Sequence, residues 1–140
     1  MHPLHRLDTR LTATAQPQTE DFAALAAQGF RAVINARPDG EDPGQPGSAE
    51  MERAARAAGL EYRHLPVRLP ALGEADVDAF AAAVAELPGP VLGFCRSGTR
   101  VAALWAWTQA RAGHADAALG TVQAAGFDLG PVHARIARVG

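Results

Sequence analysis

A short apolar segment, a glycine-containing loop and an apolar helix follow one another in the stretch Val91-Leu-Gly-Phe-Cys-Arg-Ser-Gly-Thr-Arg100-Val-Ala-Ala-Leu-Trp105. Residues 91–94 have the length and composition of a buried strand. Residues 101–111 are apolar on nearly all sides, which is typical of a helix enclosed within a domain. The stretch therefore predicts a strand, a tight loop and a buried helix, with the only cysteine of the chain at the end of the strand.

The same order of strand and helix repeats on the N-terminal side of this stretch. Apolar alternation predicts strands, and helical periodicity between glycine and proline stops predicts helices. The predicted strands span residues 10–15, 30–36 and 60–66, and the predicted helices span 22–27, 48–58, 74–87, 115–125 and 129–139. Ser48 is expected to cap its helix. Four rounds of strand and helix predict an α/β fold with a mostly parallel sheet of four or five strands and helices on both faces.

Size and composition restrict the classes of protein to which the chain can belong. A length of 140 residues with 48% hydrophobic side chains predicts one domain over residues 1–140. The net charge is −2 and the 13 basic residues form no run, so nucleic acid is not expected as a partner. No apolar segment approaches the roughly 18 residues of a membrane span, and no secretory signal is recognisable, so we expect a cytoplasmic protein with no membrane partner.

The single cysteine excludes an internal disulfide and a multi-cysteine zinc site. The five histidines form no ligand cluster in the sequence, so we expect neither a metal nor an organic cofactor.

The loop from Cys95 to Arg100 has the features of an anion site. Gly98 allows a tight turn before a helix, so successive backbone N–H groups can converge at the positive end of the helix dipole. This field and the neighbouring arginines favour a thiolate, although a lone cysteine is often a small buried hydrophobe. We therefore expect Cys95 to be the nucleophile and Arg100 the main anion ligand, with further anion contacts from Arg96, Ser97, Gly98 and Thr99.

Two other strand ends are expected at the same edge of the sheet, because ligands bind at the carboxyl ends of parallel strands. Gln16 and Arg37 follow those ends and are candidate binding residues, although Gln16-Pro17 could also merely turn the chain. Arg37 begins the longest loop, residues 37–47, which is rich in proline and glycine. The carboxyl groups of this loop are either candidate general acids or solvated polar groups, and they belong to Asp39, Glu41 and Asp42. Arg37 could contact the substrate or pair with these acids.

Several motifs together resemble the phosphatase-like domain of the beta-lactamase-hydrolase-like family, over about residues 3–112. They are Gln16-Pro17, Val33-Ile-Asn-Ala-Arg37-Pro-Asp-Gly-Glu41, Tyr62-Arg-His-Leu-Pro66-Val, Phe94-Cys-Arg-Ser-Gly-Thr-Arg100 and Leu104-Trp105. The resemblance implies a bacterial protein with the fold of dual-specificity protein phosphatases. Members of this family have been labelled both phosphatases and sulfurtransferases. Some are fused to a metallo-hydrolase-type domain that oxidises persulfides, so a persulfide-oxidising enzyme is a candidate partner.

Two departures from protein tyrosine phosphatases favour sulfur transfer. Those enzymes place five residues between the nucleophilic cysteine and the arginine, whereas four separate Cys95 from Arg100, as in the active loop of rhodaneses. Phosphatases also carry an aspartate general acid in the loop that corresponds here to residues 67–73, which contains no acid. A sulfane sulfur can leave sulfite or a thiolate without such help.

Three functions follow from the sequence. The expected one is a sulfurtransferase that moves sulfur from thiosulfate or a persulfide to a thiol acceptor through a Cys95 persulfide. The alternative is a phosphatase that hydrolyses phosphate esters through a Cys95 phosphocysteine, with Asp39, Glu41 or Asp42 as the general acid. The third is a non-catalytic module that binds anions or senses redox state through Cys95.

Overall fold

A five-stranded sheet forms the centre of the molecule, and the computed structural model describes residues 1–139. Its strands, in the spatial order β1-β2-β5-β3-β4, are β1 (His5–Arg6), β2 (Leu11–Thr14), β3 (Ala32–Asn35), β4 (Glu61–His64) and β5 (Val91–Phe94). All neighbouring pairs are parallel except β1 and β2. The predicted α/β fold with a mostly parallel sheet is confirmed. The two-residue strand β1 was not predicted, because so short a segment carries no periodic pattern.

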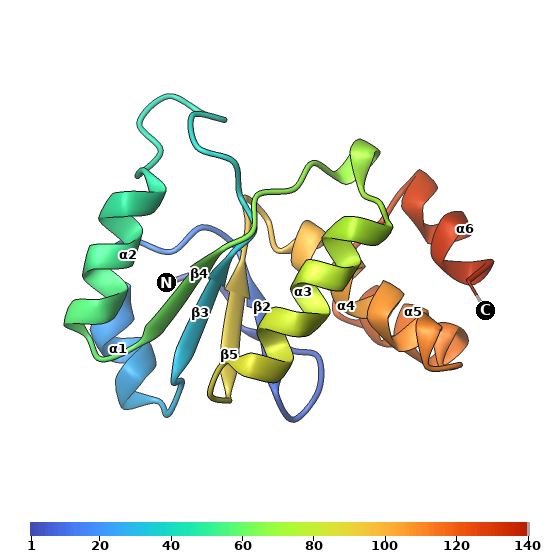
Figure 1. Cartoon of the computed structure of the whole chain (residues 1–140), viewed down its shortest axis with the longest axis horizontal. Helices are drawn as coiled ribbons and strands as arrows, with labels where there is room; N and C mark the ends of the chain where they lie inside the picture. The colour runs from blue at the N-terminus through green and yellow to red at the C-terminus, as the bar shows by residue number, and fades with distance from the viewer. Residues whose placement is uncertain (140) are drawn as a thin grey trace.

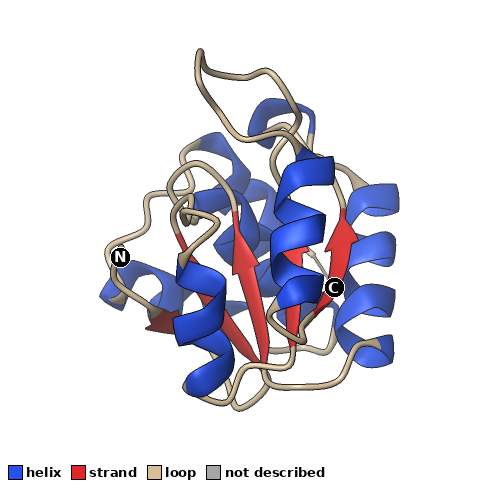
Figure 2. Ribbon diagram, turned by 90° about the vertical axis from the view of Figure 1, so that its left-hand side faces the viewer, coloured by secondary structure: helices blue, strands red, loops and turns tan. Residues whose placement is uncertain are grey.

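Helices cover both faces of the sheet (Figures 1 and 2). One face carries α1 (Asp21–Ala27) and α2 (Ser48–Ala57), and the other carries α3 (Glu74–Glu86), α4 (Thr99–Arg111), α5 (Ala115–Ala124) and α6 (Pro131–Ala137). A single 3-10 turn, η1 (Leu69–Ala71), lies between β4 and α3. The two layers bury separate apolar clusters against the central strands, so the sheet is shielded from water as a parallel sheet requires.

The central strand and the helix after it pack with almost no space between them. The side chains of α4 from Val101 to Trp107 are buried, as the sequence pattern predicts. A Cβ added to Gly93 of β5 would lie only 2.7 Å from Val101 Cγ1, so this strand position requires glycine. The close packing fixes the first turn of α4 beside the carboxyl end of β5.

The start of α2 differs from the sequence prediction. Ser48 is the first helical residue, and Gly47 is the N-cap. The Asp39 carboxylate accepts the Ser48 backbone N–H at 2.8 Å, while the Ser48 hydroxyl bonds to the Tyr62 hydroxyl. The prediction that Ser48 caps the helix was therefore wrong, because a carboxylate nine residues earlier in the chain takes that place.

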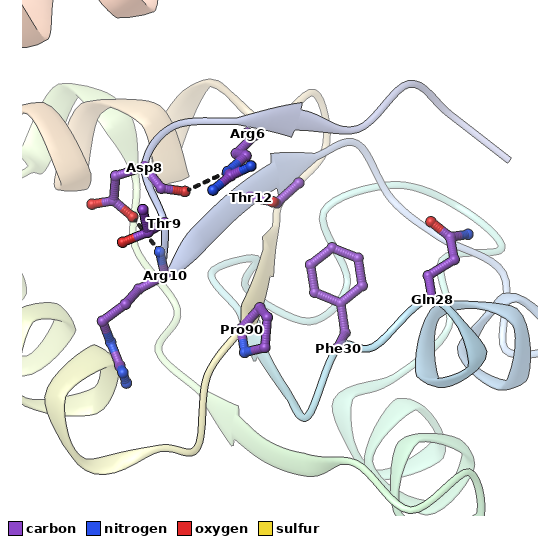
Figure 3. A pocket seen from close by; sticks show the side chains of 8 residues that line it. All are labelled: Arg6, Asp8, Thr9, Arg10, Thr12, Gln28, Phe30 and Pro90. Carbon is purple, nitrogen blue, oxygen red and sulfur yellow. Dashed lines mark hydrogen bonds between the residues drawn. The ribbon is translucent and has the colours of Figure 1, made fainter.

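The carboxyl ends of β2, β5 and β3 lie at one edge of the sheet, where the loop after β3 projects beyond the helices (Figure 1). At the opposite edge, a cavity of about 270 Å³ is lined in part by Arg10, Phe30 and Pro90, which precede strands (Figure 3). Within residues 1–139, no helix combines the length and the apolar character that crossing a bilayer demands. The same residues contain no cluster of three or more His, Cys, Asp or Glu side chains suited to a metal ion.

Candidate active site

Cys95 lies directly after β5, and its side chain is fully buried. Its Sγ accepts a hydrogen bond from the backbone N–H of Gly98 at 3.1 Å. Gly98 turns the chain into α4 with a φ of +92°, a conformation that strains residues with a Cβ. A Cβ on Gly98 would also lie 3.0 Å from Phe127 Cε1 and 3.3 Å from the Thr14 carbonyl oxygen. Glycine at this position therefore lets the loop close around the sulfur and direct a donor toward it.

The other residues of the loop lie on its outer side. Arg96 and Ser97 are exposed, and the hydroxyls of Ser97 and Thr99 share a hydrogen bond of 2.9 Å. The sequence predicts a ring of amides from this loop around an anion. Among the hydrogen bonds of residues 1–139, the amide of Gly98 bonds to the sulfur. The amide of Thr99 bonds instead to the Ser97 hydroxyl, at 3.4 Å.

Arg100 occupies the first turn of α4, and a carboxylate holds its guanidinium. Its two terminal nitrogens donate to the two Glu41 oxygens at 2.7 and 2.9 Å, and Nη1 also donates to the Val67 carbonyl oxygen at 3.1 Å. The Arg100 side chain is 12% exposed. Burial, the largest single effect, lowers the pKa of the guanidinium, but the hydrogen bonds to Glu41 and the electrostatic attraction of Cys95, Glu41 and Asp42 together raise it. Arg100 is therefore a fixed cation at the start of the helix that follows Cys95.

A second arginine, Arg37, joins the strand ends through a buried network. Its side chain is 4% exposed and donates to Glu41 Oε1 at 2.8 Å, to Gln16 Oε1 at 3.0 Å and to the Asp42 carboxylate. The Arg37 carbonyl oxygen lies 2.7 Å from Nε2 of the half-buried His64. Of the two roles considered for Arg37, the structure shows the one in which it pairs with the acids of its own loop.

Each of the three candidate general acids already has a polar partner. Asp39 is exposed and accepts the first backbone N–H of α2. Asp42 bridges Arg37 and Arg96, with 3.1 Å between its Oδ2 and Arg96 Nε. The hydrogen bond from Arg100, with a further contribution from Arg37, lowers the pKa of Glu41 to about 2. Glu41 is therefore ionised at neutral pH and cannot supply a proton there.

Sequence reasoning missed two contributors to the site. The Val67 carbonyl oxygen helps to hold Arg100, and Phe127, from the segment between α5 and α6, contacts the position of Gly98. Phe127 in turn packs edge-on against His5, with 5.0 Å between the ring centroids. No local signal marks these residues, because their roles depend on contacts between segments far apart in the chain.

A cavity of about 310 Å³ lies beside the pair formed by Arg100 and Glu41. One wall consists of the turn η1, and the cavity is lined by Glu41, Arg68, Leu69, Pro70, Ala71 and Arg100. Part of its lining comes from residues 67–73, the loop that corresponds to the one carrying the general acid in phosphatases. In this chain the loop contributes apolar side chains and one arginine to the cavity. The site thus combines a fixed cation with an apolar wall.

Acid titration is expected to remove the stabilisation that ionised Glu41 provides. Its pKa in the folded chain is about 2, against an ordinary value of 4.5, so folding favours the charged carboxylate. This stability is present above pH 4.5 and is lost as the pH falls toward 2. Glu41→Gln should cost about 2–3 kcal/mol at neutral pH, because it leaves the mostly buried guanidiniums of Arg37 and Arg100 without this charge, and far less near pH 2. Denaturant unfolding of both proteins across this range measures the difference, and a constant difference would contradict the assignment.

Known proteins match the chain in both sequence and structure. A Beta-lactamase hydrolase-like protein of Agrobacterium fabrum is 50% identical over 100 residues, which cover 71% of this chain and 23% of that protein. The chain thus spans about a quarter of the length of this curated relative. The crystal structure of a candidate phosphatase from Neisseria meningitidis superposes with a TM-score of 0.88 at 31% identity and covers 96% of each chain. PTPMT1 superposes with a TM-score of 0.69 at 16% identity and 96% coverage of each chain, which shows a shared fold.

These matches confirm the predicted fold and support an enzyme of the phosphatase type. They favour the phosphatase alternative over the expected sulfur transfer, because the matching family model is that of a phosphatase-like domain and the Neisseria protein is a candidate phosphatase. The family model for the Beta-lactamase hydrolase-like protein, phosphatase-like domain, matches residues 4–112. This chain therefore belongs to the family of beta-lactamase hydrolase-like phosphatase-like domains, as its motifs suggest.

Proposed function

We propose that this chain is a cysteine-dependent phosphatase that hydrolyses phosphate monoesters through a Cys95 phosphocysteine. The family match and the similarity to the Neisseria protein support this class of reaction. The observation that carries the proposal is the arrangement of the loop, with the Gly98 N–H on the Cys95 sulfur and the Arg100 guanidinium fixed in the next turn. Donors preorganised around a nucleophile at a helix N-terminus stabilise an anionic transition state.

The reaction has two steps. The Cys95 thiolate forms a bond to phosphorus while the bond from phosphorus to the ester oxygen breaks, and the leaving group departs with the electron pair. Water then attacks phosphorus, inorganic phosphate is released, and the thiolate is restored. Because the carboxylates of Asp39, Glu41 and Asp42 all have partners, the leaving group departs without a dedicated proton donor. We therefore expect a preference for acidic leaving groups, such as substituted phenols.

Transfer of sulfane sulfur is a second candidate, and two specific observations favour it. Four residues, not five, separate Cys95 from Arg100, which suits one small anionic sulfur better than three spread phosphoryl oxygens. The second observation is that Asp39, Glu41 and Asp42 all bind other protein groups, because a departing sulfite or thiolate needs no proton donor. In this reaction Cys95 would bond to the outer sulfur of the donor and pass that sulfur to an acceptor thiol, and a persulfide-oxidising enzyme could use the product.

Parallel assays with the purified chain separate these candidates. Aryl phosphates of graded leaving-group acidity should be hydrolysed, and the rate should fall steeply as the phenol becomes less acidic. Intact-mass measurement after exposure to thiosulfate or an organic persulfide tests the second candidate. A protein that gains one sulfur atom on Cys95 and leaves aryl phosphates intact would overturn the phosphatase in favour of sulfur transfer. Anion binding without turnover of either substrate would indicate a non-catalytic module.

A further inference from the structure

The anion site contains its own counter-anion. Glu41 holds Arg100 with two hydrogen bonds and Arg37 with a third. Counting Asp42 and Arg96, which extend the network, three guanidiniums face two carboxylates. This network keeps only one net positive charge, which ionisation of Cys95 would cancel, and the exposed Arg68 beside the cavity is a further cation outside the network. A small inorganic anion therefore meets a cation whose charge is already largely balanced.

The hydrogen-bonding capacity of Arg100 is also partly used. A guanidinium has five N–H donors. Glu41 and the Val67 carbonyl oxygen take both hydrogens of Nη1 and one of Nη2. The fork formed by Nε and the second hydrogen of Nη2 can still receive an oxyanion. Arg100 can thus orient an anion while Glu41 limits how strongly it attracts one.

The cavity beside this pair offers a different source of affinity. Leu69, Pro70 and Ala71 form an apolar wall, and the charged side chains of Glu41, Arg68 and Arg100 border the same space. Its volume of about 310 Å³ is at the lower end of the range of ligand pockets. An apolar group joined to the reacting anion can occupy it and remove apolar surface from water, which contributes about 25 cal/mol per Å².

We propose that the substrate is an organic anion whose apolar group binds against Leu69–Ala71, and that Glu41 disfavours inorganic oxyanions at Arg100. This inference rests on the proposed function in that it takes Arg100 as the anion ligand, and it deepens that function by naming the substrate class. A site of this kind would also release inorganic phosphate readily after hydrolysis, because phosphate lacks the apolar group that contributes to the affinity.

Calorimetric titration with inorganic phosphate and with phenylphosphonate tests the proposal, because the two probes share a phosphorus oxyanion head. Phenylphosphonate should bind the parent at least about tenfold more tightly than phosphate. Glu41→Gln, which keeps an oxygen acceptor and removes the charge, should tighten phosphate binding by about tenfold or more. Ala71→Phe places a ring in the exposed mouth of the cavity, so it should weaken phenylphosphonate alone.

Glu74→Gln is the matched control, because it removes a carboxylate that pairs with Arg111 and does not line this cavity. It should leave both affinities unchanged. Equal binding of the two probes by the parent, or unchanged phosphate binding in Glu41→Gln, would overturn the proposal. These measurements involve no turnover, so binding can support the proposed substrate class even if aryl phosphates are not hydrolysed. Conversely, binding can contradict the substrate class while aryl phosphates are hydrolysed. The Ala71→Phe result decides the role of the cavity should Glu41→Gln fold poorly.

Discussion

Cys95→Ser is expected to lower the turnover of aryl phosphates by at least about a thousandfold while the chain stays folded. The serine hydroxyl would occupy the position of the sulfur after β5 and could still accept the N–H of Gly98. A hydroxyl, however, is a far weaker nucleophile than a thiolate, and the described residues place no general base on it. The loss should therefore appear in kcat, with binding of inorganic phosphate little changed.

Steady-state kinetics and a thermal unfolding curve measured on the same preparation test this expectation. Thr121→Ala is a suitable control, because that hydroxyl bonds only within α5, to the Ala117 carbonyl oxygen. The control should retain the parent's activity. Retention of full activity by the Cys95→Ser variant would exclude covalent catalysis by this residue, whichever group is transferred.

Gly98→Ala is expected to abolish activity and to lower the free energy of unfolding by about 2–5 kcal/mol. An alanine would be strained at a φ of +92°, at a cost of roughly 1–2 kcal/mol. Its Cβ would also press against Phe127 and the Thr14 carbonyl oxygen, and such overpacking costs about 1–3 kcal/mol. A shift of the loop away from Phe127 or away from the Thr14 carbonyl oxygen would relieve the contact, and either shift would turn the Gly98 amide away from the Cys95 sulfur.

The matched control is Gly120→Ala, since Gly120 lies within α5 and a Cβ there would have nothing within 4 Å. Alanine is the better helix former, so this variant should gain up to about 1 kcal/mol and keep its activity. Denaturant unfolding and turnover assays compare the two. A Gly98→Ala protein as stable and as active as the parent would show that the turn does not position the donor.

The sequence predicts best those elements whose side chains are buried on nearly all sides. The strand 91–94 agrees with β5 residue for residue, and the apolar stretch after the loop is the buried helix α4, which begins two residues earlier than expected at Thr99. Such elements are continuous runs of apolar residues, which can be recognised in the sequence without knowing which other segments pack against them. The edge strand β1 and the turn η1 are too short to leave one.

The cysteine loop was identifiable as a candidate site from its composition, whereas the network around it was not. Glu41 and Arg100 are 59 residues apart in sequence, and nothing local distinguishes a carboxylate that binds an arginine from one that points into water. The same holds for Asp39, whose position in a polar loop suggests an acid but which caps α2. Pairing of this kind is decided by tertiary structure, because parallel strands bring distant loops to one edge.

The contact between Gly93 and Val101 has a consequence for motion at the site. Strand β5 and helix α4 pack closely together, so Cys95 and the backbone of Arg100 share one rigid support, and motion elsewhere should scarcely alter the distance between them. The carboxylates of Glu41 and Asp42 belong instead to a proline- and glycine-rich loop attached mainly by ionic contacts. The sulfur and the backbone of Arg100 thus share a rigid base, whereas the position of the Arg100 guanidinium depends on the acidic loop that binds it.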